Sequence, residues 1–221
     1  MRTIRVTGRG QLKLRPDVTR ITISLDGLHR EYGDALRRST ESTEAIKDLI
    51  VPFGFERSEL KTLSFSMDTE YESYRDKNGN YKQRFSGYRY RHVLKLEFPT
   101  DNERLGRLLY ALAHCSEAPE FRLSYTVSDP EGAKNILLGR AVADAKEKAA
   151  VLTGAGGVTL GEMQSIDYSW GEINIECCPM HGNMLMEACE APLAKGMSYD
   201  IDIEPDDIDL SDTVTVIWEI K

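Results

Sequence analysis

The chain has 221 residues, of which 41% are hydrophobic and 29% are charged, a composition typical of a globular protein with a sizeable core. Its net charge of −8 and pI near 5.1 argue against a general affinity for nucleic acid or anionic membranes. No apolar run approaches the roughly 18–20 residues that a membrane-spanning helix needs. The N-terminus alternates and lacks the apolar core of a secretory signal, so we expect a cytoplasmic protein with reduced cysteines.

The first half of the chain predicts strands, a helix and a long hairpin. Two alternating runs that flank Pro16-Asp17 indicate two strands, and a helix is expected from about Tyr32 to Ile50. The apolar stripe of this helix is expected to contain Leu36, Thr43, Ile46, Leu49 and Ile50. Two further alternating rows follow, separated by Asp76-Lys77-Asn78-Gly79. Since Asn-Gly is the strongest short hairpin signal, these rows predict a long β-hairpin.

The second half predicts two more helices and three more strands. A helix is expected from about Glu103 to His114, with Thr100 as its cap. A strand with Phe121, Leu123, Tyr125 and Val127 facing inward follows it, and Asp129-Pro130 then begins an Ala-rich helix that ends at the glycines of TGAGG. Strands are expected near 160–169 and at TVTVIWEI, with an irregular Cys/Met-rich insertion at about 170–199.

This order of elements predicts an α+β fold with antiparallel sheets, a long β-hairpin and about three helices packed on the sheet faces. No linker rich in Pro, Gly or Ser divides the chain, so residues 1–221 are expected to form a single domain, with two subdomains as an alternative. The small Ala face of the last helix is expected to let that helix lie close to a sheet.

Several segments together resemble the SIMPL domain family. They are VTGRGQLKLRPDVTRITISL, FGFERSELKTLSFSMDTEY, GYRYRHVLKLEF, SDPEGAKNILLGRAVADAKEKAAVLTGAGGVTLGEM and TVTVIWEI, and their order along the chain carries the resemblance. The resemblance implies a two-part α+β fold, often in a homo-oligomer. Relatives include periplasmic immunogenic proteins, an oxidative-stress defence protein and an adaptor associated with a Pelle-like kinase. The family has no established catalytic residues, so the resemblance implies a non-catalytic protein of unknown function.

The stretch CCPMHGNMLMEAC is the first candidate site. Cys177, Cys178, His181 and Cys189 are soft ligands that suit Zn²⁺ or Cu⁺. However, the spacing C-C-x-x-H-x7-C differs from the paired spacing of structural zinc sites, and adjacent cysteines rarely bind one ion. A surface loop or interface segment with adaptable methionines is therefore the favoured interpretation. A metal-binding site and a thiol redox sensor remain the alternatives.

The hairpin is the second candidate site. From Arg75 to Lys95 the chain carries a net charge of +6, which leaves −14 for the remainder. Aromatic residues interleave with these charges, a mixture that suits either nucleic acid or a protein interface. Because the remainder of an identical subunit would complement the positive charge, contact with another subunit is favoured over nucleic acid. The predicted interface residues are Arg75, Tyr81, Arg84, Phe85, Tyr88, Arg89, Tyr90 and Arg91.

These observations lead to one functional expectation. The chain contains no recognisable catalytic constellation and no motif for an organic cofactor. We therefore expect a non-catalytic, homo-oligomeric assembly or binding protein with a link to stress. Its expected partners are copies of itself and an unidentified protein, rather than nucleic acid or a membrane.

Overall fold

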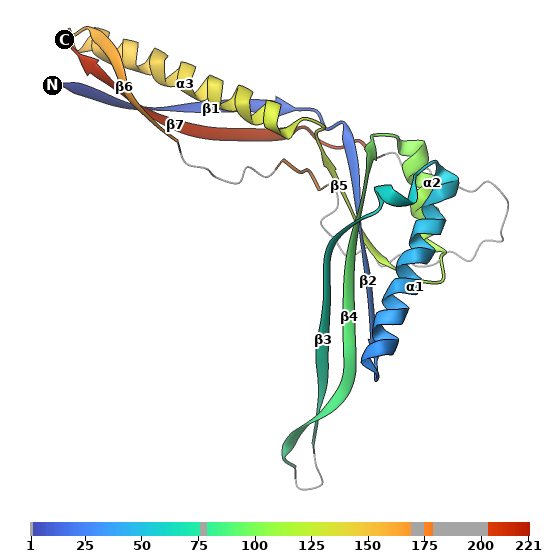
Figure 1. Cartoon of the computed structure of the whole chain (residues 1–221). Coiled ribbons are helices and arrows are strands. Elements are labelled where there is room, and N and C mark those ends of the chain that lie inside the picture. The colour runs from blue at the N-terminus through green and yellow to red at the C-terminus, as the bar shows by residue number, and fades with distance from the viewer. Residues whose placement is uncertain (1, 76–78, 169–174, 179–202) are drawn as a thin grey trace. The chain divides into compact units, whose positions relative to one another are not determined.

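A computed structural model describes residues 2–75, 79–168, 175–178 and 203–221 of the chain (Figure 1). The fold is α+β, as predicted, with two antiparallel sheets and three α-helices. The elements are β1 (Thr3–Leu14), β2 (Val18–His29), α1 (Tyr32–Ile50), 3₁₀ turns at Val51–Phe53 and Arg57–Glu59, β3 (Lys61–Arg75), β4 (Tyr81–Pro99), α2 (Asn102–Ala113), β5 (Glu120–Thr126), α3 (Pro130–Ala155), β6 (Leu160–Tyr168) and β7 (Ile208–Ile220).

The elements form two compact units. The first, here called the α3 unit, comprises Met1–Asp17, Tyr125–Cys177 and Pro205–Lys221. The second, here called the hairpin unit, comprises Val18–Ser124 and Cys178–Glu204. In the part of the chain that the structure describes, no helix is long and apolar enough to cross a bilayer.

The α3 unit is a three-stranded sheet with strand order β1-β7-β6, and α3 lies along it (Figure 1). The contact depends on small residues from both elements. A Cβ atom at Gly8 would lie 2.1 Å from the carbonyl oxygen of Ala141, and one at Gly10 would lie 2.2 Å from that of Leu137. Ala145 and Ala149 continue the buried stripe of α3. The expectation that an Ala face lets this helix approach a sheet closely is therefore confirmed.

Both ends of α3 follow the predicted chemistry. The Asp129 side chain accepts a hydrogen bond from the Gly132 backbone N–H at 2.8 Å, and Pro130 occupies the first turn. The helix ends at Ala155, and Gly157 has a φ of +65°, a left-handed conformation that favours glycine. Local sequence is sufficient to predict both ends because each depends on residues within one turn.

The hairpin unit is a four-stranded sheet with order β3-β4-β2-β5, and α1 packs on β2 and β4. Its core is built from alternate residues of these two strands and from one face each of α1 and α2. The fully or nearly fully buried members include Ile21, Ile23, Ile46, Leu94, Leu96, Leu105, Leu108 and Leu112. The tip of the β3–β4 hairpin extends beyond the end of α1 (Figure 1).

Three side-chain expectations were wrong. Leu36 is 45% exposed, because the buried stripe of α1 begins with Ala35 and Ser39. The N-cap of α2 is Asp101, whose carboxylate accepts from the Arg104 backbone N–H, and not Thr100. Phe121 is at the exposed start of β5, where burial begins only at Leu123.

Candidate interaction site

The predicted hairpin is the largest exposed feature of the hairpin unit. β3 and β4 pair in antiparallel register from Lys61↔Lys95 to Arg75↔Tyr81. Gly79 has a φ of +82°, as the Asn-Gly signal predicts for its glycine. Of the fifteen residues of β3, all but Met67 and Glu70 are exposed. The hairpin prediction is confirmed, and most of β3 is available for contact.

Aromatic rings form a continuous series along one face of the hairpin. Tyr32 at the start of α1 contacts Tyr88 edge-on at 5.5 Å between ring centroids, and Tyr88 contacts Phe85 at 5.2 Å. Phe85 in turn contacts Tyr71 of β3 at 5.9 Å. Phe65 contacts the His92 ring at 5.2 Å on the same face. Tyr71 and Phe65 are 55% and 45% exposed, so the series presents apolar surface to solvent.

Arg84 and Arg89, two of the four arginines of the hairpin, are paired with acids on neighbouring strands. Arg84 Nε lies 2.7 Å from Glu72 Oε1, and Arg89 bridges Glu70 and Asp26 at 2.8 Å each. The hydrogen bond to Glu70, with its charge and the contact to Asp26, raises the pKa of Arg89. The net charge counted along Arg75–Lys95 therefore overestimates the local positive charge, because acids on β2 and β3 lie beside Arg84 and Arg89.

The predicted interface residues differ in accessibility. Arg75 lies over the Tyr81 ring at 4.8 Å, and its Nη2 donates to the Tyr81 hydroxyl at 2.7 Å. Tyr90 is only 3% exposed because its ring packs on β2, where a Cβ at Gly27 would lie 2.7 Å from Tyr90 Cε1. Arg91 is exposed. Tyr90 therefore belongs to the core of the subunit, while the other predicted residues line its surface.

His92 connects α1 to both strands of the hairpin. Thr43 Oγ1 donates to the Ser39 carbonyl oxygen at 2.8 Å, so it accepts from His92 Nδ1–H at 3.0 Å. Nε2 then accepts from the Thr62 hydroxyl at 2.9 Å. Burial, followed by the charge of Lys47, lowers the pKa of His92. The arrangement favours a neutral imidazole that positions three elements, and it explains why His92 interrupts an otherwise apolar row.

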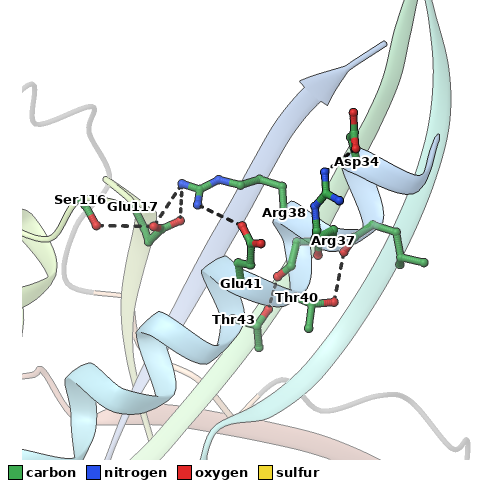
Figure 2. A network of polar contacts seen from close by, with 10 residues as sticks. Asp34, Arg37, Arg38, Thr40, Glu41, Thr43, Ser116 and Glu117 are labelled. Carbon is green, nitrogen blue, oxygen red and sulfur yellow. Dashed lines mark hydrogen bonds and ion pairs between the residues drawn. The ribbon is translucent and has the colours of Figure 1, made fainter. Parts of the chain in front are cut away.

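A polar cavity of about 270 Å³ lies between α1, the second half of β2 and residues 117–120. Arg38 from α1 contacts both carboxylate oxygens of Glu117, at 3.1 and 3.2 Å (Figure 2). The Glu117 side chain is only 9% exposed, and Glu41 lies 3.8 Å from the other guanidinium nitrogen. Since both acids belong to this chain, the guanidinium is already compensated, and the cavity gives no sign of an anion site.

The Cys/Met-rich candidate lies mostly outside the described residues. Cys177 exchanges two backbone hydrogen bonds with Tyr125, at 2.8 and 2.9 Å, and Cys178 is half-buried. His181 and Cys189 fall in the part of the chain that the structure leaves undescribed. Among the described residues no group of three or more His, Cys, Asp or Glu side chains converges on a common point. Metal binding at this segment therefore stays a prediction.

The Tyr125 side chain is fully buried beside this segment. Burial, followed by the neighbouring Cys177, raises the pKa of its phenol. Its hydroxyl makes no hydrogen bond to any described residue. A buried hydroxyl without a partner lowers stability, and sequence reasoning missed it because alternation alone assigned Tyr125 to the core.

Comparison with known proteins assigns the chain to a family whose function is unknown. The sequence pattern of the SIMPL family, described as a protein of unknown function (DUF541), matches residues 4–218. No curated protein matches the chain. A similar solved structure is the regulatory subunit of aspartate kinase from Thermus flavus, with 9% sequence identity over 97% of this chain and 89% of that one. Its TM-score is 0.15, too low to support any structural or functional argument.

Proposed function

Because the chain belongs to the SIMPL family, whose function is unknown, we propose a role from its own surface: a non-catalytic protein that assembles with copies of itself through the hairpin unit. One observation carries the proposal. Tyr71, Tyr81 and Phe85 are all more than two-fifths exposed and lie on one face of the hairpin. Contiguous exposed aromatic surface is typical of protein interfaces, where aromatic residues and arginine are enriched.

The interleaved arginines support a protein partner over nucleic acid. Arg84 and Arg89 are held by Glu72, Glu70 and Asp26, so their charges are already compensated within the subunit. Nucleic-acid binding depends on basic side chains that neutralise phosphates and release counterions. With these two arginines engaged, the hairpin keeps its aromatic surface but offers less charge to a phosphate backbone.

The edge of the other sheet is a weaker candidate for assembly. β6 also exposes apolar residues, namely Met163, Ile166 and Tyr168. However, β6 has nine residues, and its pairing with β7 shifts register twice, between Leu160 and Met163 and again before Ser165. Irregular, short edges are a common protection against strand addition. β3 is longer, and from Ser64 onward it contributes no bulged residue of its own.

Two finer parts of the proposal rest on the family resemblance. They are the link to stress and an additional, unidentified protein partner. Members of one fold family often serve unrelated functions, so these parts need evidence of their own. Self-assembly comes first, because it is argued from residues that the structure describes.

The test is the mass of the intact, reduced chain in solution. We expect an oligomer by light scattering and native mass spectrometry, with protein purified without chelator or metal-affinity tag. Replacing two exposed hairpin aromatics, Tyr81→Ser with Phe85→Ser, should lower that mass while circular dichroism stays unchanged. Ile166→Ser removes a similarly exposed apolar side chain from β6 and serves as the matched control.

Three results would count against the proposal. The first is a wild-type chain that is monomeric up to about 100 µM, well above the dissociation constant of a stable assembly. The second is an oligomer that loses mass with Ile166→Ser but not with the hairpin variant. The third is a monomer with one bound zinc or copper ion, which would instead favour the site at Cys177–Cys189.

A further inference from the structure

The free edge of β3 has the features of a strand-addition site. Among the described strands β3 is bonded only to β4, and α1 packs mainly on β2 and β4. One extra residue, Leu63, bulges from β3 between Thr62 and Ser64. From Ser64 to Tyr74 the strand is regular on its own side. Native proteins usually protect an edge of this length with a covering element, Pro or charged side chains. This segment contains no Pro or Lys, and its charged residues are Asp68, Glu70 and Glu72, all in the even-numbered row.

The two faces of this segment carry different chemistry. Phe65 is opposite His92, which bonds to α1, so the odd-numbered row Phe65, Met67, Thr69 and Tyr71 faces the helix side. The even-numbered row carries Ser64, Ser66, Asp68, Glu70 and Glu72 on the other face. Serines therefore occupy the start of the even row, and acids occupy its continuation toward the tip.

This pattern limits the ways in which two copies can pair. If a two-fold axis runs perpendicular to the sheet, both apolar rows stay on the same face, and opposite residues must then be both odd or both even. A centre at Asp68 sets two Asp68 carboxylates against each other, and centres at Thr69 or Glu70 oppose Asp68 to Glu70 or Glu72. A centre at Met67 sets Asp68 against Ser66, and a centre at Ser66 sets Asp68 against Ser64. Like charges directly opposite each other destabilise a strand pair, so these two centres are favoured over those nearer the tip.

Two charges on the even face favour the register centred at Met67. Asp68 and Arg91 are both exposed, and neither makes an ion pair with a described residue. Asp68 accepts a hydrogen bond from the Ser66 hydroxyl at 3.2 Å, and Ser66 is opposite Arg91 across the β3–β4 ladder. With the centre at Met67, Asp68 of the second copy lies directly across Ser66. The backbone of this Asp68 is then two strand spacings, about 9.5 Å, from the backbone of Arg91, so the two side chains can reach each other.

We propose that β3 of a second copy of this chain adds to this edge in antiparallel register about Met67, forming a continuous eight-stranded sheet with Asp68–Arg91 ion pairs between the copies. The inference rests on the proposed self-assembly, and it specifies the surface and the register. The occupant is a second copy rather than a foreign strand, because the chain's own edge supplies both the small residues opposite the acids and the unpaired charges.

The register is tested by cysteine crosslinking in the full chain. Opposite residues of an antiparallel pair have Cα atoms about 4.5–5.5 Å apart, which a disulfide can span. Met67→Cys should therefore crosslink two copies under diamide, with the bond located by peptide mass spectrometry among the natural cysteines. Thr69→Cys is the matched control, because the two copies of residue 69 lie about 13 Å apart in this register.

The charges are tested by reversal and restoration. Asp68→Arg or Arg91→Asp alone should raise the dissociation constant of the dimer about tenfold at low salt. Each variant places like charges together at both of the equivalent contacts between the copies. The double variant should restore wild-type affinity, since each contact becomes an ion pair of reversed polarity.

The outcomes separate this inference from the proposed function. Crosslinking at residue 67 but not 69, with restoration in the double variant, supports it. An oligomer of unchanged mass that crosslinks at residue 69, or at neither position, and ignores the charge variants overturns the register while self-assembly stands. A wild-type chain that stays monomeric overturns both.

Discussion

In the α3 unit a long helix lies so close to its sheet that two strand positions have no room for a side chain, whereas in the hairpin unit the helix packs mainly on β2 and β4, and the edge strand β3 is mostly exposed. The first contact is closed: Gly8, Gly10 and the alanines of α3 place backbone against backbone. The second sheet is covered only over β2 and β4, and it leaves apolar residues of β3 in solvent. Tight packing therefore serves stability in one unit, and incomplete packing leaves an exposed strand in the other.

The largest effect is expected from a substitution that disrupts the close contact between β1 and α3. Gly8→Ala should lower the free energy of unfolding by about 3 kcal/mol, because its Cβ would lie 2.1 Å from the Ala141 carbonyl oxygen and 2.4 Å from the Ala145 nitrogen. Both atoms belong to the helix backbone, so the clash is relieved only if α3 moves. Urea denaturation measures the change.

The same substitution on the exposed side of α3 is its control. Gly139 has no atom within 4 Å of an added Cβ, and it lies inside the helix. Gly139→Ala should therefore raise stability by about 0.5–1 kcal/mol through helix propensity. If both Gly→Ala variants changed the free energy of unfolding in the same direction, the close contact between β1 and α3 would be contradicted.

A smaller effect is expected in the hairpin unit, at the ion pair that joins α1 to the 115–120 segment. Arg38→Gln leaves the nearly buried Glu117 carboxylate without its guanidinium partner, and should cost about 1–3 kcal/mol. Arg37→Gln on the same helix removes an exposed pair with Asp34 and should cost at most about 0.5 kcal/mol. Equal losses in thermal denaturation would show that Glu117 is compensated by other groups.

The smallest effect is a dependence on pH in the hairpin unit. Because burial lowers the pKa of His92 in the folded chain, the unfolded chain takes up this proton first. The contribution of His92 to stability is complete above its unfolded pKa of about 6.5, and it declines as the pH falls through that value toward the folded pKa. Urea midpoints between about pH 5 and 7.5 should show a shallower slope for His92→Gln than for the wild type. Identical slopes would exclude His92 as the cause.

Features that depend on neighbours in the chain could be predicted from the sequence. The cap formed by Asp129 and Pro130, the Asn-Gly turn and the close approach of an Ala face all follow from local chemistry. Features that depend on which strands become neighbours could not. Glu70 and Asp26 neutralise Arg89 from two different strands, so a charge count along one segment overestimated the free charge of the hairpin.

The candidate site shows the same division. The alternating row of β3 was visible in the sequence, but its exposure was not, because alternation alone does not say which face a helix covers. Tyr90 and Tyr88 lie in one row, yet Tyr90 is buried against Gly27 while Tyr88 stays half-exposed. The space beside Gly27 on β2 separates the core residue from the half-exposed residue here, and sequence alternation does not show which strand supplies it.

The strand order of the α3 unit has a consequence for synthesis of the chain on the ribosome. β7 is the central strand of that sheet, and both β1 and β6 bond to it. Neither outer strand gains its neighbour until residues 208–220 have been translated, whereas the contiguous stretch Val18–Ser124 is complete much earlier. The N-terminal strand must therefore wait for its strand neighbour for most of translation, and its glycine-spaced row has no α3 to pack against until Ala155 has been translated. In this period a chaperone that binds β1 would have its greatest effect.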